Sequence, residues 1–511
     1  MSRFHPGVAT GHRLVTEAAA QMLKEGGNAF DAAAAAGFAG AVVEPALTSL
    51  GGGGFLLART SDGKAALFDF FVDTPGRGRT GPAEPHFFPV VVKFPGSEQI
   101  FNIGLGSVAV PGNLAGLLHV HRLLGRLPLK EVIAPAALFA RKGVELNAHQ
   151  AYFLDLLRPI MLHSEEGRRL YLKEDGSYVS EGDVVRYPDL AAFLDELAAT
   201  DGDAARDIYQ GMTGRRVVQD MELGHGLLTM EDLEQYRVVE RRPLETGFRG
   251  RRLLTNPPPS FGGFFISICL ELLDRLPLEE CSFGDLCHLL LLAEAMREVE
   301  GYRKETGTRL VHPDEKWFSE RASAIMEEAA PAFTRGTTHV SITDDQGNAA
   351  SMTTSNGEGS GYFIPGTGIM LNNMMGEDDL HPEGFHSAPP GVRVASMMSP
   401  SMLLNRGEVE LVLGSGGSKR IRTAITQVLI NWAAFSMDVE QAVISPRIHY
   451  DGELLQVEPG FSPHVLEGVS DRFKINLWQT IDVYFGGVHA VDPLGGMAAG
   501  DPRRGGAAVV L

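Results

Sequence analysis

The pattern of apolar and polar residues divides this chain into a mixed first part, a helical middle and a strand-rich last part. Residues 16–25 have the 3.6-residue spacing of an amphipathic helix. The alanine-rich stretch 32–43 is apolar on all sides but too short to cross a bilayer, which predicts a buried helix. Residues 55–59 and 65–71 are predicted to be strands on either side of the Asp62-Gly63 turn.

The middle of the chain, about residues 112–326, is predicted to be mostly helical by the same spacing. Further along, residues 340–343 and 349–354 flank a turn-rich segment and predict a β-hairpin. Residues 409–413 predict another strand, and 419–436 a helix. Strands at both ends with helices between them indicate an α+β or layered α/β/β/α body, and the sequence contains no flexible linker that would divide it.

Composition narrows the class of protein. The chain has 511 residues, of which 44% are hydrophobic and 21% charged, so it can bury a large core. Its net charge of −19 argues against nucleic acid and against an anionic membrane surface as partners. The first residues do not resemble a signal peptide, and the three cysteines are predicted to be buried thiols in a reducing compartment. We therefore expect a cytoplasmic protein.

The pair Gly336-Thr337 carries the most specific chemistry of the sequence. A threonine hydroxyl is a weak nucleophile, but if the preceding peptide bond is cut, the freed α-amine of the threonine can act as its base. Such an amine has an ordinary pKa of about 8, so a fraction of it is neutral near physiological pH. Glycine leaves the preceding bond sterically open. The pair predicts self-cleavage between residues 336 and 337.

Short motifs accompany this threonine along nearly the whole chain. They include Gly26-Gly27-Asn28-Ala29-Phe30-Asp31-Ala32-Ala33, Val43-Glu44-Pro45, Gly51-Gly52-Gly53-Gly54-Phe55, Pro257-Pro258-Pro259-Ser260, Thr337-Thr338-His339, Leu371-Asn372-Asn373, Met398-Ser399-Pro400 and Gly414-Ser415-Gly416-Gly417-Ser418. In this order and spacing the chain resembles the γ-glutamyltranspeptidase family of N-terminal-nucleophile hydrolases. The resemblance implies a four-layer αββα sandwich formed as one body by two autocleaved subunits. These would be a large subunit, 1–336, and a small catalytic subunit, 337–511, which stay associated.

The resemblance also implies roles for individual residues. Thr337 would be the nucleophile both in self-cleavage and in catalysis, and Thr354 would hold its hydroxyl group. Gly416 and Gly417 would donate backbone N–H groups to the oxyanion, where glycine permits close approach. The implied substrate-binding residues are Asn356, Ser396, and Asp379 or Asp378. For Thr354 and Asn356, an exposed strand threonine and a turn asparagine are the competing interpretations. We expect His339 to be a packed histidine without a catalytic role.

The sequence departs from the family pattern at positions that are implied to contact the substrate. Phe71 stands where family members that bind glutathione have an arginine for the substrate α-carboxylate. Arg77, Arg79 and Arg393 are possible substitutes. Met397 replaces the second of two serines, Met374 replaces a glutamine, and Gly376-Glu377 resembles an insertion. These changes make the predicted pocket less polar. Loss of a desolvated guanidinium–carboxylate pair costs about 2–5 kcal/mol.

The leading hypothesis is a self-processing γ-glutamyl hydrolase or transferase. It would open γ-glutamyl amides such as glutathione through an ester on Thr337, and pass the acyl group to water or an amino acid. Neither a metal nor an organic cofactor is implied. The expected partners are a small γ-glutamyl or related acyl amide and the protein's own cleaved subunit. The alternatives are an amidase with an altered acyl pocket, of the glutaryl or cephalosporin type, and a non-cleaving relative. A nucleotide-binding function is disfavoured, because the glycine clusters of this chain lack the lysine motif that such a function requires.

Overall fold

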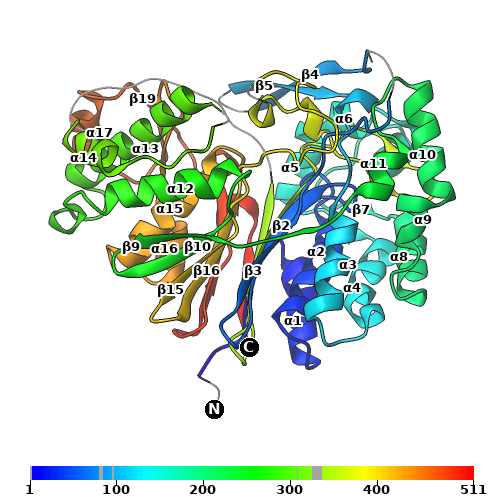
Figure 1. Cartoon of the computed structure of the whole chain (residues 1–511), viewed down its shortest axis with the longest axis horizontal. Helices are drawn as coiled ribbons and strands as arrows, with labels where there is room; N and C mark the ends of the chain where they lie inside the picture. The colour runs from blue at the N-terminus through cyan, green and yellow to red at the C-terminus, as the bar shows by residue number, and fades with distance from the viewer. Residues whose placement is uncertain (1–2, 80–83, 95–96, 308, 325–336, 382) are drawn as a thin grey trace.

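Two antiparallel sheets form the centre of the molecule (Figure 1). The computed structural model describes residues 3–79, 84–94, 97–307, 309–324, 337–381 and 383–511. The larger sheet has seven strands in the order β22-β1-β11-β12-β2-β3-β8, and the smaller has six in the order β21-β20-β16-β15-β10-β9. They face each other through contacts of β11 with β16 and β20. The strands therefore form the mixed α+β body that the sequence predicted, with the predicted strands in both sheets.

The strands of the two sheets come from both ends of the chain. The larger sheet consists of β1 (Gly7–Thr10), β2 (Gly53–Arg59), β3 (Ala65–Phe70), β8 (Val239–Arg241), β11 (Thr338–Thr343), β12 (Ala349–Ser355) and β22 (Ala507–Val510). The smaller consists of β9 (Leu244–Phe248), β10 (Arg251–Thr255), β15 (Ser401–Asn405), β16 (Glu408–Gly416), β20 (Gly487–Asp492) and β21 (Met497–Ala499). Segments before and after Thr337 are thus neighbours in each sheet.

Helices cover the outer face of each sheet. Against the larger sheet and behind it lie α1 (Arg13–Lys24), α2 (Ala29–Val43), α3 (Asn113–Leu124), α4 (Leu129–Lys142) and α8 (Pro188–Ala199). Against the smaller sheet and behind it lie α12 (Phe261–Leu273), α13 (Leu286–Thr306), α15 (Arg420–Ala433) and α16 (Val439–Ile444). Figure 1 shows these two groups of helices on opposite sides of the sheets.

Shorter elements complete the described part of the chain. The helices are α5 (Ala148–Leu156), α6 (Arg158–Met161), α7 (Glu165–Tyr171), α9 (Ala205–Gln210), α10 (Met212–Leu223), α11 (Met230–Gln235), α14 (Glu315–Ala324) and α17 (Pro463–Ser470). Short 3-10 turns are η1 (Leu105–Ser107), η2 (Leu278–Glu280), η3 (Met374–Gly376), η4 (Asp378–Leu380), η5 (Val483–Phe485) and η6 (Pro502–Arg504). The remaining strands are β4 (Phe88–Phe94), β5 (Ser97–Ile103), β6 (Val144–Glu145), β7 (Val184–Val185), β13 (Phe363–Ile364), β14 (Ile369–Met370), β17 (Ile448–Tyr450), β18 (Leu455–Val457) and β19 (Ile475–Leu477).

Helix α2 is the predicted buried helix, and every residue in it is buried. It begins three residues before the expected start because Asn28 caps it. The Asn28 side chain accepts hydrogen bonds from the N–H groups of Phe30 and Asp31, and the Asp31 carboxylate accepts one from the Asn28 N–H. Its small alanines let α1 and α4 pack closely against it. The helix ends at Val43, and the residue that follows it, Glu44, lies at the candidate site described below.

The predicted hairpin is β11–β12, in the middle of the larger sheet. Its register pairs Thr338 with Thr354 and Thr343 with Ala349. On its far side β12 pairs with β2, where Gly54 lies opposite Thr354. The hairpin is therefore enclosed on both sides by strands from the first part of the chain, which fixes the position of its first residues.

The cysteine prediction was wrong for two of the three residues. Cys281 and Cys287 form a disulfide with an S–S distance of 2.03 Å, and Cys269 is a buried free thiol. The turn after η2 brings the two Cα atoms within 5.5 Å, although six residues separate them in sequence. Disulfides are typical of oxidising compartments, so the cytoplasmic location stays a prediction.

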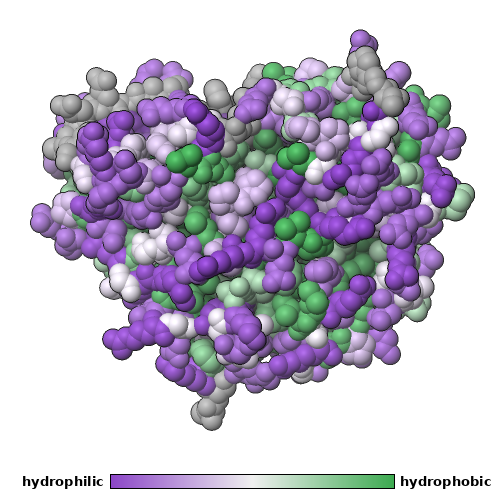
Figure 2. Space-filling view, viewed as in Figure 1, coloured by the Kyte–Doolittle hydropathy of each residue, from purple (hydrophilic) through white to green (hydrophobic). Residues whose placement is uncertain are grey.

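The surface is predominantly hydrophilic on the face drawn in Figure 2, where hydrophobic residues show in separate groups. Among the helices of the described residues, none is long and apolar enough to cross a membrane.

Candidate active site

Thr337 lies directly before β11, on a cavity of about 300 Å³. The side chain of Thr337 is buried, with 4% of its surface exposed. The described residues that line this cavity, which we call the acyl cavity, are Phe71, Thr337, Ser355, Met374, Glu377, Leu380, Ser396, Met397, Met398, Ser418 and Ile421. Segments that are far apart in sequence therefore meet at the predicted nucleophile.

Strand alternation places Thr354 on the other side of the sheet from this cavity. Thr338 and Thr354 are paired, so their side chains share one face. On that face the Thr48 hydroxyl donates to the Thr354 hydroxyl at 3.0 Å, and the Thr338 hydroxyl donates to the Glu44 carboxyl at 3.3 Å. The same register, extended by one residue, puts Ser355 opposite Thr337, and both line the acyl cavity.

The Gly416-Gly417 pair lies against the nucleophile segment, at the end of β16. A Cβ atom on Gly416 would lie 1.8 Å from the Thr337 carbonyl oxygen, so only glycine fits there. Gly417 has a φ of 122°, which side-chain-bearing residues rarely adopt. The following residues lead into α15, whose N-terminal end carries a partial positive charge. Gly416 therefore lies directly against the backbone of the predicted nucleophile.

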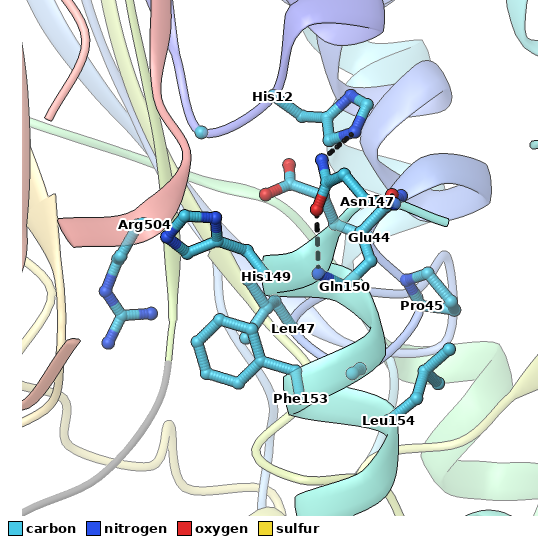
Figure 3. Close-up of a pocket in the computed structure, with 12 residues that line it drawn as sticks. His12, Glu44, Pro45, Leu47, Asn147, His149, Gln150, Phe153, Leu154 and Arg504 are labelled. Atoms are coloured by element: carbon cyan, nitrogen blue, oxygen red, sulfur yellow. Dashed lines mark hydrogen bonds between the residues drawn. The ribbon is translucent and has the colours of Figure 1, made fainter. Parts of the chain in front are cut away.

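Behind the Thr337-Thr338 backbone lies a second cavity, of about 360 Å³. Figure 3 shows Arg504 on one side of it, Pro45 and Leu154 on the opposite side, and Glu44 between them. The Arg504 guanidinium donates to the Thr337 carbonyl oxygen at 3.0 Å. Its neighbour Arg503 is buried in ion pairs with Glu458 and Asp501, which hold η6 in place. Arg504 and Glu44 together hold the first two residues of the predicted small subunit.

Burial gives Glu44 an unusual titration. Desolvation raises the pKa of its carboxyl from 4.5 to about 7, although the Thr338 hydrogen bond and the Arg504 charge oppose the increase. The folded protein then retains a proton that the unfolded chain releases above pH 4.5. Stability associated with this group is complete at low pH and is lost as pH rises to about 7.

Replacement of Glu44 by glutamine is expected to remove this pH dependence. Between pH 4.5 and about 7 the wild type should lose roughly 3 kcal/mol of unfolding free energy relative to Glu44→Gln. Thermal unfolding followed across pH 4–8 measures the difference, with the exposed Glu145→Gln as control. Parallel curves for wild type and Glu44→Gln would contradict the assignment.

The predicted substrate-binding residues are only partly brought together. Ser396 lines the acyl cavity, and its backbone carbonyl accepts from Phe261 N–H and from the Ser260 hydroxyl, each at 2.7 Å. The Pro257–Gly263 motif thus positions the Ser396 segment. Asn356 is buried but is not among the described lining residues. Asp378 is exposed, and the Asp379 side chain lies outside the described residues.

Glu377 brings a carboxylate to the acyl cavity that the family pattern did not predict. It is 7% exposed and lines the acyl cavity, so the segment that resembled an insertion delivers its own carboxylate to the site. His339 is confirmed as a packed histidine. Its ring nitrogens bond to the hydroxyls of Thr353 (2.8 Å) and Ser341 (2.9 Å), and burial holds its pKa well below the usual value.

Comparison with known proteins places this arrangement in a family. The gamma-glutamyltranspeptidase model matches residues 15–511. The chain belongs to the gamma-glutamyltranspeptidase family. It is 31% identical over 507 residues to a glutathione hydrolase proenzyme from Escherichia coli K12, covering 91% of this chain and 85% of that protein. It is 32% identical over 490 residues to an acylase ACY 1 proenzyme from Pseudomonas sp. strain SE83, covering 91% and 86%.

The fold is also similar to that of a solved structure. A cephalosporin acylase from Bacillus halodurans superposes with a TM-score of 0.82 at 24% identity, covering all of this chain and 96% of that one. Glutathione hydrolases and acylases therefore both occur among the relatives of this chain. Family membership makes it an enzyme, but the family alone does not name the acyl group.

Three arginines were expected as possible replacements for the family arginine that is absent at Phe71. None of the three is among the described residues that line the acyl cavity. Arg77 donates to Gln235 and to the Gly391 carbonyl, and Arg79 donates to the Gly226 carbonyl. Arg393 lies behind Phe71 and donates to the Phe71 carbonyl. Phe71 itself stacks on Phe55, with ring centroids 5.4 Å apart, so an apolar ring occupies the position of the guanidinium.

Arg393 is also neutralised by its surroundings. It pairs with Asp69 at 3.4 Å and with Asp73 at 3.0 Å, and it donates to the hydroxyl of Tyr236 at 3.0 Å. It lines a neighbouring cavity of about 710 Å³ that shares Leu380 with the acyl cavity. Asp69 also pairs with Arg241 at 2.7 Å, so two carboxylates balance two guanidiniums there.

Proposed function

We propose that this protein is a self-processing N-terminal-threonine amidase or acyltransferase, active through an acyl ester on Thr337. The observation that carries the proposal is Thr337 directly before β11, buried on a cavity with Ser355 and in contact with Gly416. Membership in the gamma-glutamyltranspeptidase family supports it.

Two reactions use the same hydroxyl group. Before cleavage, Thr337 Oγ attacks the Gly336 carbonyl carbon, and the peptide C–N bond breaks as its nitrogen takes up the Oγ proton, which frees the α-amine; water then hydrolyses the ester and releases Oγ and the Gly336 carboxylate. Afterwards the α-amine takes the proton from Oγ as it attacks a substrate amide. Backbone N–H groups at Gly416 and Gly417 are assigned to the developing oxyanion, and Ser355 to the hydrogen bond that orients Oγ.

The interleaved sheets support two subunits that remain together. We assign residues 1–336 and 337–511 to them, within a four-layer αββα arrangement. Strand β1 of the first pairs with β11 and β22 of the second, and β10 pairs with β15. Separation of the two would break both sheets, so cleavage does not release either piece.

The substrate is an acyl amide. Similarity to glutathione hydrolases makes γ-glutamyl amides such as glutathione one candidate. Similarity to acylases makes an altered acyl group the other, and Phe71 at the arginine position favours it. The test of the common chemistry is a denaturing intact-mass spectrum after incubation at neutral pH. Two species matching 1–336 and 337–511 are expected; a single 55.1-kDa species would contradict self-processing.

Ser355, rather than Thr354, is expected to affect catalysis. Ser355→Ala should lower kcat by roughly 100-fold because the nucleophile loses its orienting hydroxyl. Thr354→Val should cost about 1 kcal/mol of stability, through the lost Thr48 hydrogen bond. Steady-state kinetics with a chromogenic amide and thermal unfolding measure the two effects. A larger fall in kcat for Thr354→Val than for Ser355→Ala would show that strand parity has been assigned wrongly.

A further inference from the structure

We propose that the acyl group of the substrate is a long and mainly apolar chain, of octanoyl length or longer, whose far end enters the neighbouring cavity of about 710 Å³. We call this neighbour the distal cavity. The inference rests on the proposed function, because it concerns the acyl group that Thr337 would receive. It goes beyond the candidates above, since γ-glutamyl and glutaryl groups are short and end in charged groups.

The acyl cavity and the distal cavity share one wall. Leu380, on η4, is among the described residues that line both. In three further places, a residue that lines the acyl cavity is hydrogen-bonded to a residue that lines the distal cavity. These pairs are the Phe71 carbonyl with the Arg393 guanidinium, the Met374 carbonyl with the His381 ring at 3.0 Å, and the Ser396 carbonyl with the Phe261 N–H at 2.7 Å. A single layer of residues therefore stands between the two cavities along this wall.

This wall lies at the end of the acyl cavity away from the nucleophile. At the nucleophile end, strand register sets Ser355 opposite Thr337, and Ser418 follows the Gly416-Gly417 turn. Neither serine is among the described residues that line the distal cavity. An acyl group attached to Thr337 Oγ therefore begins at one end of the acyl cavity, and its chain runs toward Leu380 and the distal cavity.

The distal cavity suits an apolar chain. Eight of its thirteen described lining residues are apolar, among them Phe261, Leu310, Val394 and Ala395. A space of about 300 Å³, as in the acyl cavity, is at the small end for ligand sites, whereas about 710 Å³ lies well inside their range. A short acyl group would fill only the first space. A longer chain would also bury methylene groups in the second, and each buried methylene is worth up to about 4-fold in binding.

The reaction needs no reactant beyond water. Thr337 Oγ bonds to the acyl carbonyl carbon, the amide C–N bond breaks, and the amine leaves with the proton that the α-amine received from Oγ. Water then adds to the ester, the C–Oγ bond breaks, Oγ regains a proton, and the free carboxylic acid is released.

The experiment compares three p-nitroanilides on the cleaved wild-type enzyme: octanoyl, butyryl and suberyl, the last matched to octanoyl in length but ending in a carboxylate. All three release the same amine, so the differences report on the acyl group alone. We expect kcat/KM for octanoyl to exceed that for butyryl by roughly 30-fold or more, because additional methylene groups are buried. It should exceed that for suberyl by about 10-fold or more, because the carboxylate would lose its hydration. Equal values for octanoyl and butyryl, a preference for suberyl, or no hydrolysis of any of the three would overturn the inference.

A pair of variants tests the location of the chain. Ala395→Phe adds a ring to the distal cavity and should reduce the ratio of octanoyl to butyryl kcat/KM by about 10-fold or more. The control is the same substitution at Ala198 on α8, which is also half-buried but is not among the described residues that line either cavity. Ala198→Phe should keep the ratio. An unchanged ratio in Ala395→Phe would overturn the assignment of the distal cavity to the chain.

The intact-mass spectrum of each preparation separates the two levels of failure. Self-cleavage of Ala395→Phe shows that the fold around Thr337 is intact in that variant. Cleaved wild-type protein without the expected chain preference contradicts only the acyl class, whereas uncleaved wild-type protein contradicts the proposed function.

Discussion

Thr337→Ala is expected to give a single uncleaved chain of 55.1 kDa without measurable amidase activity. The substitution removes the one hydroxyl that performs both proposed reactions, so turnover should fall by roughly 10⁴-fold or more. Thr337→Ser keeps a hydroxyl at the same atom and should still cleave, at a reduced rate. Intact-mass spectra over time and the initial rate with a chromogenic amide measure the two effects.

The neighbouring threonine provides a matched control for this result. Thr338→Val removes the hydrogen bond to Glu44 but leaves Thr337 unchanged, so cleavage should still produce fragments that begin at residue 337. If Thr337→Ala were cleaved at the same bond, Thr337 could not be the nucleophile. Loss of cleavage in a normally folded Thr338→Val would show instead that the Glu44 contact is required to position the nucleophile.

Phe71→Arg is expected to change the acyl preference toward carboxylates. It places a guanidinium in a cavity whose described lining contains Glu377 and no cation. We expect the kcat/KM for a glutaryl anilide, relative to that for a butyryl anilide, to rise by roughly 10–100-fold. The ratio is measured on self-cleaved protein, because self-cleavage shows that the fold around Thr337 is intact.

Phe71→Leu separates charge from shape in this experiment. It also loses the stacking on Phe55, but it adds no charge, so the ratio should stay near the wild-type value. An equal rise in both variants would mean that added space, rather than the cation, admits the carboxylate. No rise in Phe71→Arg would show that the wild-type ring is not what excludes carboxylates.

Much of this fold was predictable because its elements carry strong local signals. The alanine-rich run of α2, the β11–β12 hairpin and the helix after Gly416-Gly417 were all expected, and the structure confirms them. Their boundaries moved by a few residues. In α2 the reason is the Asn28 cap, which starts the helix before the alanine-rich run.

The candidate site was less predictable because it depends on register and on distant contacts. A shift of one residue decides which side of a strand faces the nucleophile, and this shift separates Ser355 from Thr354. The pairing of Thr343 with Ala349 across the turn was the signal that could have identified Ser355. Arg504 lies 167 residues from Thr337 and has no motif around it that points there, so only the folded chain reveals the contact.

Glu377 shows a different limit of prediction from the sequence. The family pattern marks it as an inserted residue and points to Asp378 and Asp379 as the acids that bind substrate. In the fold, η3 ends at Gly376 and η4 begins at Asp378, so Glu377 is the residue between two tight turns. That position directs one carboxylate inward and leaves Asp378 exposed. Sequence distance from a motif does not determine which of the two adjacent acids Glu377 and Asp378 faces a cavity.

Residues 1–336 and 337–511 share both sheets, so self-cleavage would change how the protein unfolds and refolds. As one chain, the protein folds by a unimolecular process that does not depend on its concentration. Once it has cut itself, unfolding also separates two molecules, so its melting temperature rises with concentration and recovery requires an encounter between partners. Strands β1, β11 and β22 must then reassemble from different molecules. Maturation would thus leave a protein that folds readily once, as a single chain, and refolds with more difficulty after the two cleaved chains have separated.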